Sequence, residues 1–217
     1  MKHKYPRTYH LPFSECLAGD DKYIQDPNMF DGKDVVVSIK MDGENTTIAK
    51  EYTHARSLDS RGHPSRDWLK AWHSTFAHDI PPNLRICGEN LFAKHSIQYD
   101  DLDSYFYGFS VWEDIKCLSW DETLAWFELY NIFSVPVIYC GEYDKDKILA
   151  DYEPFKEKHE GFVVRNSDSF LYDDFNKNVA KFVRKNHVQT TQHWMVEGIK
   201  PNKLKTGLTL DQYMVKY

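Results

Sequence analysis

The chain is organised around residues 35–45, which read VVVSIKMDGEN. The β-branched run at the start of this stretch is typical of a buried strand. Asp42-Gly43 then favours a tight, hairpin-like turn, and Thr46-Thr47-Ile48 predicts that a second strand follows. Lys40 is thus held at the end of an apolar strand, beside a turn. This position makes Lys40 a candidate nucleophile rather than a solvated surface charge.

Other segments are also short, rich in Val, Ile, Tyr and Phe, and bounded by turn residues, as strands are. The predicted strands cover residues 35–40, 46–49, 85–89, 105–111, 135–140, 161–165 and 179–183. Aromatic residues at fourfold spacing from Trp68 predict a helix over residues 65–77, and a Ser119–Glu122 capping box predicts a second helix to about Leu129. This order indicates an α+β fold with mainly antiparallel sheets flanked by helices. No repeat divides residues 1–217, so we expect one domain with a short C-terminal tail from about residue 188.

Composition excludes several classes of protein. Hydrophobic residues make up 41% of the 217-residue chain, which is enough for a packed core. The four cysteines are scattered, with no Cys-x-x-Cys pair, so neither a disulfide framework nor a structural zinc site is expected. No apolar run approaches the length of a membrane span, and no secretory signal precedes the first strand. We therefore expect a cytoplasmic protein with no membrane partner.

The formal net charge of −6 is unevenly distributed along the chain. Residues 99–160 carry a balance of −10, which leaves +4 on the remainder of the chain, where most of the chemically interesting motifs lie. Attraction to phosphate acts within a Debye length of about 8 Å, so a basic face can coexist with an acidic one. On charge alone, an acidic enzyme with no nucleic-acid partner fits equally well.

Five further motifs follow the Lys40 turn. In order, they are Ser60-Arg61-Gly62, Gly88-Glu89-Asn90, Tyr107-Gly108-Phe109-Ser110, EGFVVR at 160–165 and AKFVRK at 180–185. The series resembles the motif set of the ATP-dependent RNA ligases of phage and bacteria, which are covalent lysine nucleotidyltransferases. The resemblance extends from His10 to Thr190, and Asn45 matches the RNA-ligase form of the first motif. It implies a nucleotidyltransferase (ATP-grasp-like ligase) domain in a compact form, because only about thirty residues follow the last motif, too few for an OB-fold domain.

The resemblance implies that Lys40 attacks the α-phosphorus of ATP, releases pyrophosphate and carries AMP. The AMP would then pass to an RNA 5′-phosphate, and a 3′-hydroxyl would seal the ends. A lysine with a reference pKa of about 10.4 is protonated at neutral pH and cannot attack. We therefore expect the pKa of Lys40 to be lowered by burial and by nearby cations, with Arg61 and Lys181 as candidates.

Other roles follow from the same resemblance. Arg61 would bind phosphate and ribose, with Arg56 as its rival, and Glu89 would accept a hydrogen bond from a ribose hydroxyl. Phe109 would stack on adenine, with Tyr107 as a near alternative because alternate residues of a strand share a face. The remaining nucleotide-binding candidates are Ile39, Met41, Asn45 and Lys181.

Glu160 resembles the glutamate that helps to hold a catalytic Mg²⁺ or Mn²⁺, and magnesium needs only one or two carboxylates beside water and phosphate oxygens. Val183 stands where the family often has a second lysine, so Arg184 or Lys185 would have to replace it. RNA ends or a nicked duplex would be the macromolecular substrate, and an end-healing kinase or phosphatase is a conceivable partner. The candidates for RNA contacts are Arg56, Arg66, Lys94, His95, Arg165, Arg184 and Lys185.

Two other classes remain open from the sequence. One is a different nucleotidyltransferase, either a DNA ligase or a GTP-using capping enzyme. The other is a non-catalytic nucleic-acid-binding relative that kept the fold. Lys40, Glu89, Glu160 and Lys181 in one chain favour the enzyme, because a binding protein needs no nucleophile.

Overall fold

Two β-sheets lie side by side in the computed structural model, which describes residues 2–16, 21–59, 62–185 and 198–205. The first sheet has the order β1 (Tyr9–His10), β12 (Val179–Val183), β10 (Gly161–Asn166), β2 (Asp34–Lys40) and β9 (Val137–Glu142). The second has the order β11 (Phe170–Leu171), β7 (Lys116–Cys117), β6 (Phe106–Glu113), β5 (Leu84–Asn90), β3 (Glu44–Ala49) and β4 (Tyr52–Ala55), with β8 (Phe133–Ser134) beside β6. Most of these pairs are antiparallel, whereas β1–β12 and β6–β8 are parallel. The predicted α+β fold with mainly antiparallel sheets is confirmed.

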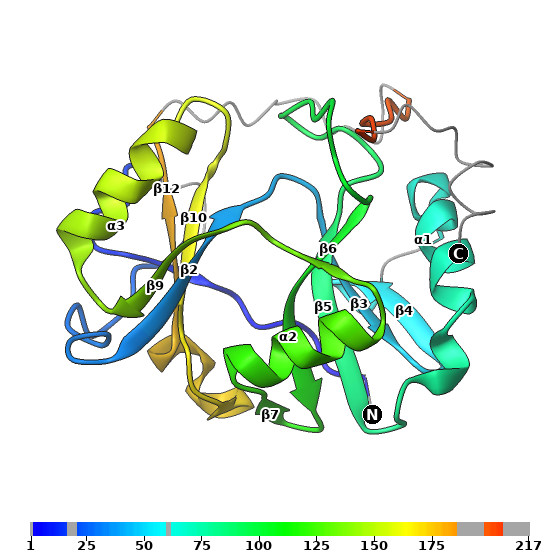
Figure 1. Cartoon of the computed structure of the whole chain (residues 1–217), viewed down its shortest axis with the longest axis horizontal. Helices are drawn as coiled ribbons and strands as arrows, with labels where there is room; N and C mark the ends of the chain where they lie inside the picture. Colours follow the sequence, from blue (N-terminus) through cyan, green and yellow to red (C-terminus); the bar gives the residue numbers. More distant parts are fainter. Residues whose placement is uncertain (1, 17–20, 60–61, 186–197, 206–217) are drawn as a thin grey trace.

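The Asp42-Gly43 turn carries the chain from one sheet to the other. β2 pairs with β10 and β9, whereas β3 pairs with β4 and β5, so the two strands flanking the turn are not partners. The expected hairpin was therefore wrong, because both edges of each strand are occupied by other strands. Figure 1 shows the chain crossing from β2 to β3 between the sheets. A side chain at Gly43 would come within 2.6 Å of the Asn90 carbonyl oxygen, so close approach to β5 requires glycine there.

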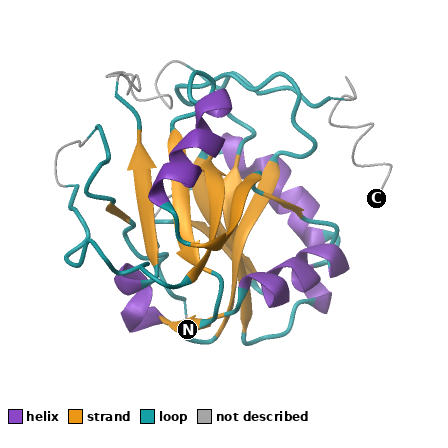
Figure 2. Cartoon of the chain, turned by 60° about the vertical axis from the view of Figure 1, so that its left-hand side comes forward, coloured by secondary structure: helices purple, strands orange, loops and turns teal. Residues whose placement is uncertain are grey.

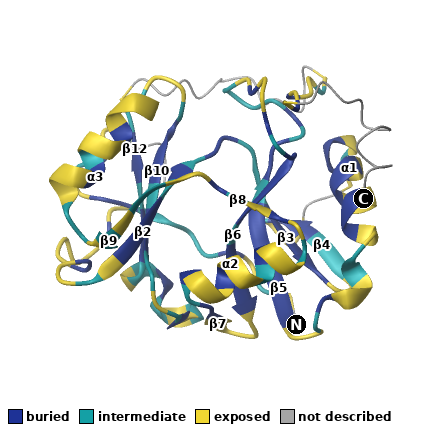
Figure 3. Cartoon of the chain, in the orientation of Figure 1, coloured by how far each residue is buried: buried dark blue, intermediate teal, exposed yellow. Residues whose placement is uncertain are grey.

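Helices cover the outer sides of the sheets (Figure 2). The first predicted helix is shorter than expected: a 3₁₀ turn over Pro64–Arg66 precedes α1 (Asp67–Ser74), in which the buried Trp68 and Trp72 rings stack with centroids 5.6 Å apart. The second, α2 (Trp120–Leu129), begins at the predicted capping box. Ser119 Oγ accepts the Glu122 N–H, and the Glu122 carboxylate accepts the Ser119 N–H in return. Figure 3 shows buried strands beneath helices whose outer faces are exposed.

Some elements have no clear signal in the sequence. β4 is short, and α3 (Lys145–Tyr152) buries only Ile148 and Tyr152, too few residues to mark a helical period. Its N-terminus is nevertheless capped, because the Asp144 carboxylate accepts the N–H groups of Asp146 and Lys147. Three further 3₁₀ turns cover Ala77–Asp79, Glu153–Phe155 and Tyr172–Lys177. None of the helices in the described ranges is long and apolar enough to cross a membrane.

Part of the predicted tail is folded back onto the molecule. Residues 186–197 and 206–217 lie outside the described residues, but residues 200–205 pair with the loop of residues 91–104. The Lys94 N–H donates to the Lys200 carbonyl, and the Leu102 N–H donates to the Lys203 carbonyl. This docked segment therefore borders the loop that follows β5.

Candidate active site

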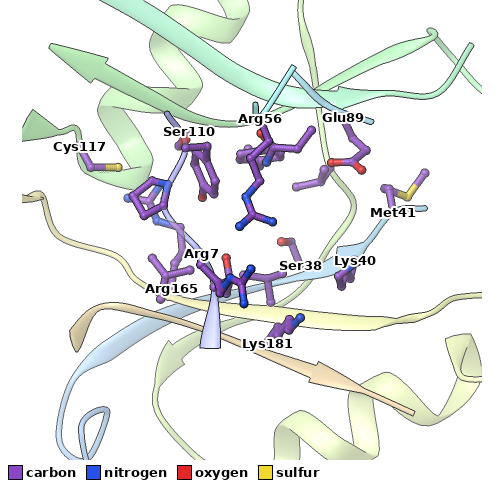
Figure 4. A pocket seen from close by; sticks show the side chains of 18 of the residues that line it. Arg7, Ser38, Lys40, Met41, Arg56, Glu89, Ser110, Cys117, Arg165 and Lys181 are labelled. Atoms are coloured by element: carbon purple, nitrogen blue, oxygen red, sulfur yellow. The ribbon is translucent and has the colours of Figure 1, made fainter. Parts of the chain in front are cut away.

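A pocket of about 310 Å³ opens between the two sheets, and five of the predicted motifs contribute to it or to its rim (Figure 4). Strands of both sheets line it, together with the N-terminal segment of residues 5–8. The lining residues that the sequence predicted for nucleotide binding or catalysis are Ile39, Lys40, Met41, Asn45, Glu89, Phe109 and Lys181. Glu160 reaches the same site through its contact with Lys40. Motifs separated by up to 141 positions in the sequence thus meet at one place.

Lys40 stands at the end of β2, where it pairs in register with Gly161 at the start of β10. This register brings the neighbouring Glu160 to the lysine, and Lys40 Nζ donates to Glu160 Oε2 at 2.5 Å. Both side chains are largely buried, with 27% of Lys40 and 11% of Glu160 exposed. The pair is therefore a shielded ion pair, in which attraction is stronger than at an open surface.

The predicted direction of the Lys40 pKa shift was wrong. Burial by itself lowers the pKa of Lys40, but the charges of Glu160, Glu89 and Asp42, with the hydrogen bond to Glu160, outweigh it and raise the pKa. The immediate neighbours of the amine are carboxylates rather than the expected cations. Arg61 lies outside the described residues, and Lys181 is paired with Asp21. Lys40 is therefore protonated in this state, and nucleophilic attack requires that its carboxylate neighbours be neutralised first.

Glu89 lies in the same acidic group. Burial, opposed by Lys40 and reinforced by Glu160 and Asp42, raises the pKa of Glu89 to about 8. The Gly43 N–H donates to Glu89 Oε1 at 3.2 Å and anchors the side chain at the turn. The pKa of Glu89 is raised mainly by burial and further by its acidic neighbours, and a bound cation would favour its charged form.

Hydrogen bonds of Asp42 hold the turn that follows Lys40. Its Oδ2 accepts the N–H groups of Ser96 and Ile97, both at 2.7 Å, and its own N–H donates to Tyr99 Oη at 3.0 Å. The carboxylate thus ties the turn after Lys40 to the loop of residues 91–104. Its negative charge still acts on Lys40 and Glu89.

Phe109 lines the pocket because β6 contains a bulge. Cys87 pairs with Ser110 and the next residue, Gly88, pairs with Gly108, so Phe109 is an extra residue without a partner on β5. Strict alternation therefore fails at this point, and both Phe109 and Ser110 face the pocket. Tyr107 is buried in the main core, and its hydroxyl accepts the Asp103 N–H, so it is not the pocket aromatic.

Two polar side chains face the pocket with unsatisfied groups. Arg56 Nε and Asn45 Oδ1 are buried and have no hydrogen-bond partner in the part of the chain that the structure describes. Figure 4 shows the Arg56 side chain reaching into the pocket from the seven-stranded sheet. Buried polar groups are almost always satisfied, so these atoms indicate a polar ligand. Arg56 was predicted mainly as an RNA contact, yet it is a wall of the nucleotide-sized pocket.

Two pocket residues were missed by sequence reasoning. Arg7 and Asp21 both line the cavity, and Figure 4 shows Arg7 and Ser38 among the side chains that line it. Asp21 Oδ1 lies 3.1 Å from Lys181 Nζ. No local motif marks Arg7 or Asp21, because they reach the pocket through the parallel pairing of β1 with β12, about 170 positions later.

This geometry agrees with comparisons with known proteins. Residues 33–183 match the sequence profile of RNA ligases. The chain belongs to the RNA ligase family. No curated protein matches the chain.

Solved structures resemble the chain in fold. An archaeal ATP-dependent RNA ligase, form 2, has a TM-score of 0.58 at 17% identity, with 83% of this chain and 48% of that one covered. A Naegleria gruberi RNA ligase with PPi has a TM-score of 0.54 at 20% identity, with 83% and 57% covered. A candidate ATP-dependent DNA ligase from Aquifex aeolicus has a TM-score of 0.55 at 18% identity, with 83% and 50% covered. The present chain spans about half the length of these proteins.

The remaining RNA-contact candidates lie in different settings. Arg66 is buried and makes a two-point contact with Glu44, at 2.6 and 2.5 Å, so we do not retain it as an RNA contact. Arg165 is also buried; its Nη2 donates to the Leu118 carbonyl at 2.8 Å, which places it at the inner wall of the pocket rather than on an RNA-binding surface.

The other candidates are less enclosed. Lys94 and His95 are half-buried on the loop of residues 91–104, and Lys185 is exposed. Arg184 Nε donates to the His159 carbonyl at 2.9 Å. Neither Arg184 nor Lys185 is among the described residues that line the pocket, so a role in place of the second lysine of the last motif stays a prediction. Lys94, His95, Arg184 and Lys185 remain predictions for RNA contact.

Proposed function

We propose that this ligase seals RNA 5′-phosphate and 3′-hydroxyl ends with ATP, through a Lys40–AMP intermediate and an adenylylated RNA. The observation that carries the proposal is the convergence of Lys40, Glu160, Glu89 and Lys181 on one pocket. An amine among carboxylates, with a cation and an aromatic wall nearby, suits nucleotidyl transfer. A protein that only binds nucleic acid needs no amine in such a place.

The pocket fits a nucleoside triphosphate with a divalent cation. Two structures of mutant Naegleria gruberi RNA ligases hold ATP and Mn, at TM-scores of 0.52 and identities of 15% and 16%. In the present chain, no group of three or more metal-ligating side chains exists in the described residues. A sparse site at Glu160 and Glu89, completed by phosphate oxygens and water, matches what Mg²⁺ prefers. When bound, the cation would stabilise charge on the phosphates.

Different pocket residues suit different parts of the nucleotide. Phe109 offers a ring for the base, while Arg56 and Asn45 offer unsatisfied polar atoms for ribose or phosphate. Lys181 offers an ammonium for the α-phosphate. With Glu160 neutralised, the main cause of the raised Lys40 pKa is removed, and burial favours the neutral amine.

The proposed reaction has three steps. Lys40 Nζ forms a bond to the α-phosphorus as the bond to pyrophosphate breaks, and the amine loses its proton to solvent. An RNA 5′-phosphate oxygen then displaces the lysine and takes the AMP. Finally a 3′-hydroxyl oxygen attacks the RNA phosphorus, and AMP leaves. The substrate must therefore carry a 5′-phosphate and a 3′-hydroxyl, and an end-healing kinase or phosphatase partner stays a prediction.

Intact-mass measurement after incubation with ATP and Mg²⁺ tests the first step. We expect wild-type protein to gain one AMP and Lys40→Ala to gain none. Lys50→Ala is the matched control, because Lys50 is exposed at a turn away from the pocket. Absence of an adduct on the wild type would leave a binding protein as the better interpretation.

Nicked duplexes with RNA or DNA at the 3′-hydroxyl side separate RNA from DNA joining. We expect sealing to be faster with RNA at that side. Faster sealing of an all-DNA nick would indicate a DNA ligase, to which the similarity with the Aquifex aeolicus structure also points. Adduct formation with GTP in place of ATP would indicate a capping-type enzyme.

A further inference from the structure

A row of polar side chains starts at Lys181 and Asp21 in the pocket wall and continues into the protein. Lys181 Nζ lies 3.1 Å from Asp21 Oδ1, and Asp21 Oδ2 lies 3.0 Å from His10 Nε2. His10 Nδ1 lies in turn 2.7 Å from Ser14 Oγ. Four side chains from β12, β1 and the segment that follows β1 are thus arranged end to end. The proposed chemistry uses only the first of them.

The row is rigid at its inner end. His10 is 1% exposed and stands opposite Lys181 in the parallel β1–β12 pair. Ser14 Oγ accepts the Val183 N–H at 2.9 Å, and its own proton goes to His10 Nδ1 at 2.7 Å, a shorter contact than the 3.4 Å to the Val183 carbonyl. The proton of a neutral His10 then sits on Nε2, facing Asp21. Since β12 carries Lys181, Ser14 and His10 are fixed to the same strand as the lysine that they serve.

His10 is neutral in this setting. Burial, together with the charges of Lys181 and Lys40, lowers its pKa more than the contact with Asp21 raises it. Its Nε2 lies 3.0 Å from the Asp21 carboxylate. A buried N–H beside a carboxylate can hold that carboxylate in one position.

We propose that Asp21 and His10 are positioning residues for Lys181, and this inference rests on the proposed function. In the nucleotide-free protein, Asp21 holds the Lys181 ammonium at the pocket wall. When a nucleotide phosphate becomes a second partner of Lys181, the His10 N–H holds the Asp21 carboxylate in place beside the ammonium. The carboxylate is thereby kept from competing with phosphate, and Lys181 stays aligned for the reaction.

Single-turnover formation of the Lys40 adduct, measured over a range of ATP concentrations, tests the inference. We expect Asp21→Asn to lower the maximal rate by about tenfold, with the half-saturating ATP concentration changed by less than about threefold. Asp151→Asn is the matched control, because Asp151 is exposed on α3, and it should react at the wild-type rate. The thermal midpoint of each variant is measured alongside.

Substitutions at His10 test its role in positioning Lys181. His10→Leu should slow the reaction as Asp21→Asn does, whereas His10→Gln should keep the rate within about threefold of wild type, because its amide can donate to Asp21 in place of Nε2. Combining His10→Leu with Asp21→Asn should add little to either single change, since the residues act as one unit.

Three outcomes would overturn the inference while leaving the proposed function intact. The first is wild-type adduct formation at full rate by Asp21→Asn. The second is a His10→Gln variant that folds normally yet is as slow as His10→Leu. The third is full additivity in the double variant. If His10→Leu does not fold, Asp21→Asn decides, because Asp21 is partly exposed at the pocket wall and Asn has the same shape. Failure of wild-type protein to form any adduct would instead refute the proposed function.

Discussion

Lys40 and Glu160 show how the reactivity of one residue depends on its neighbours. The amine is buried, which by itself favours the neutral form, but three carboxylates hold its proton in place. The pocket therefore favours the protonated form of Lys40, in which an amine cannot act as a nucleophile. A cation bound at Glu160 would lower the pKa of Lys40, because it would neutralise the carboxylate that stabilises the protonated amine.

Replacing Glu160 by Gln should change the reactivity of Lys40 in two opposite directions. Without nucleotide, Lys40 should be labelled faster by an amine-acylating reagent at pH 8, because the strongest charge that raises its pKa is gone. With ATP and Mg²⁺, adduct formation should fall by about a hundredfold or more, because the carboxylate proposed to hold the cation is lost. Peptide mass spectrometry measures both, with Lys50 labelling as the internal control. Equal labelling of Lys40 in the two proteins would contradict the assigned role of the ion pair.

The ring of Phe109 is proposed to stack on the base of ATP. Stacking of a base on an aromatic ring is worth about 1–3 kcal/mol, so Phe109→Leu should weaken ATP binding by about 5- to 150-fold. Titration calorimetry on a Lys40→Ala background measures the affinity without turnover. Tyr107→Phe is the control, because it removes only the hydroxyl contact with Asp103 outside the pocket. An unchanged ATP affinity in Phe109→Leu would show that the base does not stack on this ring.

Two elements position the site, although neither carries a reactive group. The bulge in β6 turns Phe109 into the pocket, and the segment of residues 200–205 holds the loop of residues 91–104. Asn202 is central to the second contact: its Oδ1 accepts the Tyr99 N–H at 2.9 Å, and its Nδ2 donates to the Leu91 carbonyl at 2.8 Å. That loop in turn supplies the two N–H groups bound by Asp42.

Asn202→Ala should lower the free energy of unfolding by about 2–4 kcal/mol, because it leaves buried backbone groups of the loop without partners. Urea unfolding followed by tryptophan fluorescence measures the change. Gln98→Ala is the control: Gln98 is exposed and contributes only its amide contacts with Tyr99 and Asn202, so its loss should cost well under half as much. A near-neutral Asn202→Ala would mean that the docked segment contributes little to the fold.

At the scale of the whole molecule, buried histidines couple stability to pH. Burial lowers the pKa of His10, His54, His73 and His159, so each is preferentially neutral in the folded protein. In the unfolded chain a histidine titrates near its ordinary value of about 6.5. Below that pH the unfolded chain binds more protons, so the stabilisation is fully present above about pH 6.5 and is lost as the pH falls through the lowered folded-state pKa values.

The urea midpoint should therefore decrease between pH 7.5 and pH 5. His73→Gln should make this decrease shallower, because the amide can keep the 2.9 Å contact with the Ala49 carbonyl but cannot take up a proton. Parallel unfolding curves at the two pH values compare the variant with wild type. An identical pH slope in the two proteins would show that His73 does not contribute to the effect.

The amino-acid sequence by itself determined the α+β class, most of the longer strands, the α2 capping box and the set of motif residues. The strands and the capping box depend on local composition and on periods of two or four residues, which are visible in a short window of the chain. Lys40 was also a candidate from its place at a strand end, whereas Glu89, Phe109 and Lys181 were predicted from the resemblance to the RNA-ligase motif set.

Only the tertiary structure decided the sign of the Lys40 pKa shift, the bulge at Phe109 and the contribution of Asp21 and His10. Each of these depends on which strand lies beside which. The β2–β10 register delivers Glu160 to Lys40, and the parallel β1–β12 pair brings His10 to Lys181. Electrostatic shifts follow from distances of a few ångströms between residues more than a hundred positions apart, and such distances have no local signature in the sequence.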